Sequence, residues 1–186
     1  MLKKTAQGFT LVELLVVIAI IAVLAAVVVL IINPVELTRR SRDAARLTDL
    51  ANLQQAINVA VQEATGSGTA AILCANDFNN GPSACRGASN TDSRNSNGTG
   101  WVQVNLGAQK SVSVATLPID PINDSGDHYT YCSNGDTYEI DAVLESEQQK
   151  GKMLTDGGNE NEPGSARYEV GSNLNLVAAS GGSCTY

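Results

Sequence analysis

A single carboxylate interrupts the longest apolar run of the sequence. The run extends from Gly8 to Ile32, and Glu13 is the only charged residue in it. An ionisable group inside a membrane segment is costly and usually has a partner or a function. The pattern therefore predicts that Glu13 pairs with an opposite charge, which a plain membrane anchor would not require.

A short basic leader precedes the apolar run. Met1 to Gly8 carries Lys3 and Lys4, and the candidate cleavage point lies between Gly8 and Phe9. An ordinary secretory signal has its cleavage site after the apolar region. Here the order is reversed, which indicates a different kind of leader.

The same residues resemble the type IV pilin and type II pseudopilin superfamily, whose N-terminal pattern is K-x-x-x-x-G followed by F-T-L-x-E. The resemblance rests on Lys3, Lys4, Gly8, Phe9, Thr10, Leu11, Val12 and Glu13. It implies cleavage after Gly8 by a prepilin peptidase on the cytoplasmic face and N-methylation of Phe9. Glu13 would then be the fifth residue of the processed protein.

Physical chemistry indicates a role for Glu13 in assembly. In a helical array of copies, Glu13 of one subunit would lie near the new amino group on Phe9 of a neighbour. Opposite charges attract strongly at low dielectric, and each is costly alone. Small residues would let the apolar helices approach closely, namely Ala19, Ala22, Ala25 and Ala26. The alternative is a single-pass anchor with a tolerated interfacial glutamate.

Two helical stretches must position these groups. The apolar run is long enough to cross a membrane, and Asn33-Pro34 predicts a kink or a melted turn before the helix resumes. From Val35 to about Thr65 the pattern is amphipathic, so one face must bury against a sheet. Its apolar residues are Leu47, Leu50, Leu53, Ile57, Ala60, Val61 and Ala64. Gly66-Ser67-Gly68 is expected to end the helix.

Charged residues cluster just beyond the apolar run. They are Arg39, Arg40, Arg42, Asp43, Arg46 and Asp49. One interpretation is salt bridges between subunits of a filament. The other is a solvated helix face with internal pairs, such as Arg42 with Asp49 or Asp43 with Arg46.

Strand signals follow an Asn-, Ser- and Gly-rich loop from Ala75 to Gly100, which has little to build a core. Alternation predicts a first hairpin from segments 101–106 and 111–117. Asn134-Gly135 predicts a second hairpin between segments 129–133 and 137–144, and segment 167–170 follows. The motifs L-P-x-D-P at 117–121 and Y-E-I-x-A-x-L-E-S at 138–146 also look like the C-terminal half of pseudopilins and related bacterial pilins. We expect an α+β pilin fold, a long N-terminal helix packed on a small antiparallel sheet.

All four cysteines lie beyond the apolar run. The lysines of the leader would keep the N-terminus in the cytoplasm, which leaves the globular part in an oxidising compartment. Four cysteines allow three pairings, and we favour Cys74 with Cys85 and Cys132 with Cys184. Thiolate metal binding is the competing account, but the chain has no CxxC pair and its only histidine is His128.

Acidic residues in two loops could hold calcium, which prefers oxygen ligands. The first loop has Asp120, Asp124 and Asp127, and the second has Asp156, Glu160 and Glu162. Some pseudopilins carry a calcium-binding loop near the C-terminus, so we name the second set as the candidate. No other cofactor is expected. His128 is interpreted as a surface loop residue, and Trp101, Tyr129, Tyr131 and Tyr138 as core or half-buried sheet residues.

The whole chain divides into a leader, 1–8; an apolar half-helix, 9–33; an amphipathic half-helix, 34–65; and a globular head, 66–186. The formal net charge of −7 argues against general nucleic-acid binding. We expect the chain to be a major pilin and not an enzyme. Its precursor would lie in the membrane, and prepilin peptidase and the assembly machinery would convert it into an extracellular filament of identical subunits. A type II secretion pseudopilin and a membrane-tethered binding domain are the alternatives.

Overall fold

The computed structural model describes residues 8–64, 72–74, 85–107, 109–111, 113–158, 166–177 and 184. The chain forms two compact units, of which the first ends at Thr38 and the second runs from Arg39 to Tyr186. The fold is α+β, with an N-terminal apolar helix, a second helix and a four-stranded antiparallel sheet.

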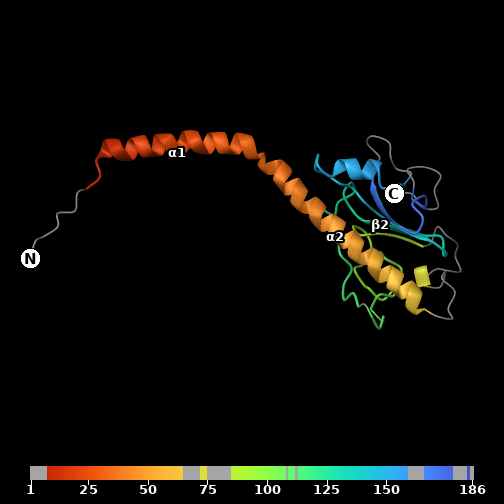
Figure 1. Ribbon diagram of the computed structural model, residues 1–186. Helices are drawn as coiled ribbons and strands as arrows, with labels where there is room; N and C mark the ends of the chain where they lie inside the picture. Colours follow the sequence, from red (N-terminus) through yellow and green to blue (C-terminus); the bar gives the residue numbers. More distant parts are fainter. Residues whose placement is uncertain are drawn as a thin grey trace, which may run out of the picture. The chain divides into compact units, whose positions relative to one another are not determined.

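Helix α1 (Figure 1) spans Leu11–Ile32. It begins with a capping box. The hydroxyl oxygen of Thr10 accepts from the Glu13 amide, and the Glu13 carboxylate accepts from the Thr10 amide. These two bonds satisfy amide groups that the first turn leaves without helical partners. Segment Leu11–Val29 has a mean hydropathy of 3.2 and is long and apolar enough to cross a membrane.

The predicted break between the helices is present at a single residue. Asn33 ends α1 in the left-handed region, with φ 43°, and α2 begins at Pro34 and runs to Glu63. Asn33 Oδ1 also accepts from the Glu36 amide at 3.4 Å, so this side chain caps the second helix. Proline suits the first position of a helix because its missing N–H needs no partner there. The predicted helix end at 66–68 lies outside the described residues.

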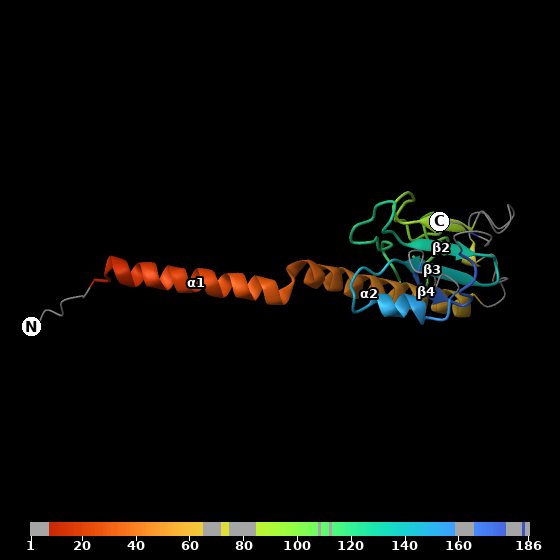
Figure 2. The same ribbon diagram turned by 90° about the horizontal axis from the view of Figure 1, so that it is seen from above.

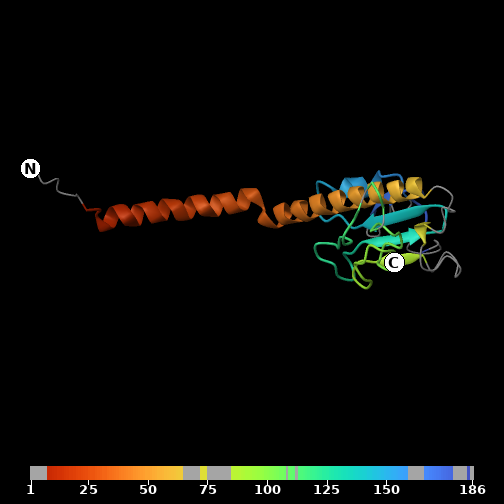
Figure 3. The same ribbon diagram turned by 90° about the horizontal axis from the view of Figure 1, so that it is seen from below.

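In the second unit, α2 buries one face against the sheet (Figure 3). Its fully buried apolar residues are Leu50, Leu53, Ala56, Ile57 and Ala60. They pack with aromatic and aliphatic side chains of the sheet and the preceding loops, namely Trp101, Val102, Val104, Leu106, Leu117, Tyr129, Tyr131, Tyr138 and Ile140. The aromatic residues thus belong to the core.

The sheet has the strand order β1-β2-β3-β4, with every neighbouring pair antiparallel (Figure 2). The strands are β1, Arg86–Ala88; β2, Thr130–Ser133; β3, Tyr138–Ala142; and β4, Tyr168–Gly171. A short 3-10 helix, η3, spans Lys150–Leu154. The hairpin predicted at Asn134-Gly135 is confirmed, because it joins β2 to β3 with Gly135 at φ 96°.

The other predicted hairpin is wrong. No strand forms in the described part of 101–117, and Trp101 and Val102, which are consecutive, are both fully buried. The amides of Trp101 and Leu106 donate to the carbonyls of Ser93 and Ser96, at 3.0 and 2.7 Å. The segment therefore forms its backbone hydrogen bonds mainly with the preceding loop.

The prediction also missed β1, which lies in the region interpreted as a surface loop with little core. Its sequence Arg86-Gly87-Ala88 has no strand propensity, so the alternation signal is absent. A Cβ atom at Gly87 would collide with the backbone of Trp101. Glycine here allows the Trp101 segment to pack directly on the edge strand.

Candidate functional site

The N-terminal site is built on the first turn of α1. Gly8 has no other atoms within 4 Å of where a Cβ would be, and Phe9 is 86% exposed. The Thr10 amide and the Thr10 hydroxyl both donate to Oε2 of the Glu13 carboxylate, at 3.1 and 2.8 Å. Within one chain Glu13 is therefore a helix cap, and its charge is also favourable at a helix N-terminus.

The rest of α1 presents apolar side chains outward on all sides. Every side chain of α1 that the structure describes is exposed. An apolar groove runs along the helix, lined by Leu15, Val16, Ala19, Ile20, Val23 and Leu24. Ala19, one of the four small residues expected to permit close helix approach, lies in this groove. So large an apolar surface must be covered by lipid or by other protein.

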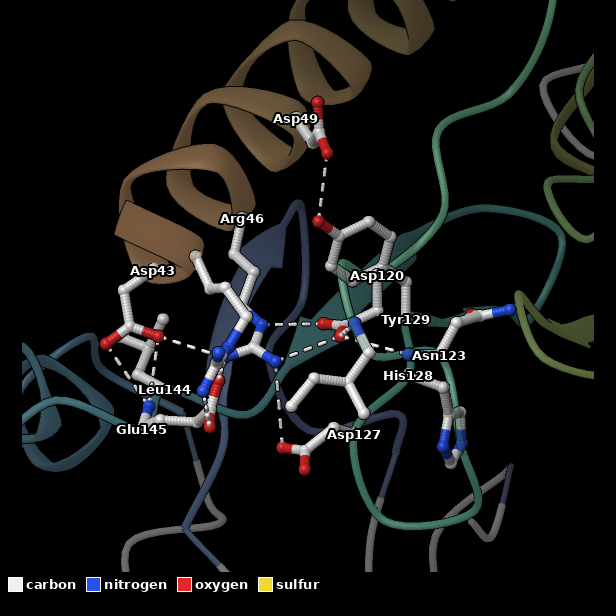
Figure 4. Close-up of polar contacts among 12 residues, drawn as sticks. Asp43, Arg46, Asp49, Asp120, Asn123, Asp127, His128, Tyr129, Leu144 and Glu145 are labelled. Atoms are coloured by element: carbon white, nitrogen blue, oxygen red, sulfur yellow. Dashed lines mark hydrogen bonds and ion pairs between the residues drawn. The ribbon is translucent and has the colours of Figure 1, made fainter. Parts of the chain in front are cut away.

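A second cluster of charged residues lies inside the globular unit and centres on Arg46 (Figure 4). Arg46 and Asp43, one turn apart on α2, are both fully buried. The Arg46 guanidinium donates to Asp120 at 2.6 and 2.9 Å, to Asp43 at 3.0 Å and to Glu145 at 2.7 Å. We call these residues the Arg46 network.

The network holds two loops on the helix. Asp43 accepts from the amides of Glu145 and Ser146, and Asp120 accepts from the amides of Ile122 and Asn123. Buried charges persist when they are paired and fully hydrogen-bonded. The L-P-x-D-P motif and the Glu145-Ser146 pair, which carry the resemblance in the C-terminal half, thus contribute to packing of the globular unit.

Electrostatics in the network favour the charged forms. Burial alone would raise the pKa of Asp43, but donors from Ser146, Glu145 and Arg46 hold it below its usual value. The hydrogen bond from Arg42 lowers the pKa of Glu145, and Arg46 adds to this effect. Burial alone would lower the pKa of Arg46, yet Asp120 and the other two carboxylates raise it.

Of the two predicted ion pairs within α2, one is present and the other is not. The pair of Asp43 with Arg46 is present at 3.0 Å. The pair of Arg42 with Asp49 is wrong, because Arg42 forms two 2.7 Å bonds with Glu145 and Asp49 accepts from the Tyr129 hydroxyl at 2.9 Å. Both partners come from distant segments, which helix spacing cannot reveal. Salt bridges between subunits stay a prediction.

The first acidic loop has internal partners. Asp120 is bound by Arg46, and Asp127 lies 3.8 Å from the same guanidinium. Asp124 Oδ1 accepts from the amides of Gly126 and Asp127, each at 2.8 Å. The interpretation of His128 as a surface residue is wrong, because it is 7% exposed and its Nδ1 lies 3.2 Å from the Asp124 carbonyl oxygen.

Of the proposed calcium ligands, only Asp156 is described. It accepts from the amides of Gly158 and Glu169, at 3.2 and 3.0 Å. Glu160 and Glu162 lie outside the described residues.

Sequence reasoning missed a different acidic cluster in the sheet. Glu139, Asp141 and Glu169 are buried, and one carboxylate oxygen of each lies within 4.8 Å of the others. Burial raises the pKa of Asp141 well above its ordinary value, and the nearby Glu139 carboxylate adds to this effect. Alternating acids in a strand usually mark a solvated face, so the pattern gave no sign of this burial.

The structure contains two disulfides, Cys74–Cys85 and Cys132–Cys184, which are the pairings favoured from the sequence. The second joins β2 to the C-terminal segment. There, Cys132 and Cys184 form a small buried cluster with Leu176 and Val177.

The comparisons with known proteins concern the N-terminus. Residues 3–29 match the family model described as the prokaryotic N-terminal methylation motif. No curated protein and no solved structure matches the chain. The motif implies processing by prepilin peptidase, and together with the apolar helix it fits a membrane-anchored precursor. The chain carries the class III signal of type IV pilins and pseudopilins, and this motif supports a type IV pilin-like or pseudopilin protein.

Proposed function

We propose that this chain is the major subunit of an extracellular type IV pilus-like filament made of identical copies. The observation that carries the proposal is the position of Glu13, a single acid at the start of an apolar helix whose described side chains are all exposed. Such a helix suits lipid before assembly and a bundle of like helices afterwards. The proposed role is structural and involves no catalysis.

Processing would create the partner of Glu13. Cleavage between Gly8 and Phe9 leaves a positive amino group, which is then methylated on Phe9. Two opposite charges 4 Å apart attract by about 4 kcal/mol at an effective dielectric constant of about 20. The pairing of Glu13 with Phe9 of a neighbour therefore favours transfer of the subunit from lipid into the polymer.

A head-to-tail contact of this kind uses different surfaces on the two copies, and it generates a ring or an open helix. The groove around Ala19 supports this arrangement, because a small residue lets a neighbouring helix approach closely. Apolar half-helices would then bundle at the filament axis.

A pseudopilin of a type II secretion system is the second candidate. It is favoured by the L-P-x-D-P motif, whose Asp120 is bound by Arg46 in the globular unit. Shear fractions separate the two candidates, because abundant extracellular filaments built mainly from this chain support the pilus. Scarce material that stays in the periplasm supports the pseudopilin instead.

Mass spectrometry of the mature N-terminus tests the processing step. We expect a chain that begins at methylated Phe9. A monomer that stays in the membrane with an intact bond between Gly8 and Phe9 would contradict the proposal and favour a membrane-tethered binding domain.

A further inference from the structure

The buried acidic cluster is produced by strand alternation and register. On β3, Tyr138 and Ile140 belong to the core that packs on α2, so Glu139 and Asp141 face the opposite side of the sheet. Asp141 is directly opposite Glu169 on β4 in the antiparallel register. Three carboxylates from two neighbouring strands thereby meet on one face.

Hydrogen bonds to Glu139 fix the direction of its carboxylate. Its Oε2 accepts from the amides of Leu176 and Val177, at 2.7 and 3.0 Å. Its Oε1 is buried without a hydrogen-bond partner in the described part of the chain. The two oxygens of Glu139 therefore differ, because Oε2 is bound to the C-terminal segment and Oε1 stays buried without a partner among the described residues.

Asp141 is the residue that points most directly to a ligand. It is fully buried, and neither of its carboxylate oxygens has a hydrogen-bond partner among the described residues. A buried carboxylate without a partner is strongly unfavourable. Arg167 also acts on Asp141 electrostatically, but one positive charge does not balance three carboxylates.

We propose that Glu139, Asp141 and Glu169 bind one calcium ion. Calcium takes oxygen ligands at 2.3–2.6 Å, so two ligands of one ion lie at most about 5 Å apart. The limit of 4.8 Å among these three oxygens fits that sphere. Magnesium requires shorter bonds in near-ideal octahedral geometry and keeps several waters, which suits a fully buried set of three carboxylates less well.

The ion would join parts of the chain that are distant in sequence. It would link β3 to β4 directly and, through the amides held by Glu139, would brace the segment that the Cys132–Cys184 disulfide also ties down. Asp156 holds the amide of Glu169, so the second acidic loop would support the site without supplying its ligands.

Equilibrium dialysis of the full-length chain in detergent with radioactive calcium tests the site directly. We expect one tightly bound ion per chain, retained in a 100-fold excess of magnesium. Absence of stoichiometric binding to the wild-type chain would overturn the proposal whatever the variants do.

Variants then place the ion. We expect Asp141→Asn to lose the bound calcium, and Asp136→Asn, the same change at an exposed hairpin residue, to retain it. Calcium at 100 times its Kd should raise the Tm of the wild type and Asp136→Asn by about 5–10 °C over a chelator. The proposal is overturned if calcium does not change the wild-type Tm and Asp141→Asn is more stable than wild type. This result would show that the carboxyl groups share protons instead of binding an ion.

Discussion

Arg46 on α2 and Asp120 in the loop before β2 form a buried, two-bonded ion pair, with nitrogen–oxygen distances of 2.6 and 2.9 Å. The two residues are 74 positions apart in sequence. Their pairing fixes the proline-rich loop on the helix, and Asp43 and Glu145 also accept hydrogen bonds from the same guanidinium. The globular unit thus contains a polar clamp beside its apolar core.

Removing the Arg46 guanidinium should strongly destabilise the globular unit. In Arg46→Ala, Asp43 and Asp120 stay buried without their partner, and loss of one member of a buried pair costs about 3–5 kcal/mol. We expect the free energy of unfolding, measured by urea denaturation with Trp101 fluorescence, to fall by that amount. Arg40→Ala, an exposed change on the same helix, should stay within about 0.5 kcal/mol of wild type. Equal stability of the two variants would contradict the clamp.

The ion pairs of this clamp should also make the stability of the globular unit sensitive to acid. The pKa values of Asp43 and Glu145 are lower in the folded chain than their usual values, so these groups stabilise the fold above their unfolded pKa values. That stabilisation is lost as the pH falls below about 4 through the folded values. In Asp43→Asn, the unfolding free energy should therefore fall less between pH 5 and pH 3 than in wild type. Urea denaturation across this range checks the difference, and parallel pH profiles would refute it.

The two disulfides should differ in their contribution. They close segments with sequence separations of 52 and 11 residues. The chain-entropy model gives about 4 kcal/mol for the longer and about 3 kcal/mol for the shorter. We expect the double serine variant at Cys132 and Cys184 to unfold at lower urea than the one at Cys74 and Cys85. The reverse order would mean that unfolded-state entropy does not dominate.

Features with a local cause could be predicted from the sequence. The apolar helix, the break at Asn33-Pro34 and the turn at Asn134-Gly135 each depend on a few neighbouring residues. The amphipathic face around Leu50 and Ile57 is likewise read from helical spacing.

The sequence-favoured disulfide pairings are present, but the non-covalent contacts between distant residues could not be predicted. The partners of Arg42 and Asp49 come from loops 103 and 80 residues away, respectively. Glu139 and Asp141 alternate with apolar residues as on a solvated strand, yet both are buried, and the Glu139 carboxylate accepts from an amide of the distant C-terminal segment. The segment after Trp101 alternates too, yet the loop before it supplies its hydrogen bonds.

Glu13 has both a charge, which we propose drives assembly, and a capping role, and variants can separate the two. Glu13→Gln keeps the capping box, since glutamine also caps, but removes the charge. Thr10→Ala removes the hydroxyl that accepts from the Glu13 amide and keeps the charge. Glu147→Ala, an exposed acid paired with Lys150 in the globular unit, is the control for loss of any carboxylate.

The most direct measurement is the yield of sheared filaments from these three variants, each first checked for processing to Phe9. We expect Glu13→Gln to be processed but to give few filaments, at least tenfold below wild type, while Thr10→Ala and Glu147→Ala assemble normally. Normal filaments from Glu13→Gln, together with failure of Thr10→Ala, would show that the cap and not the charge is required, and would contradict the account.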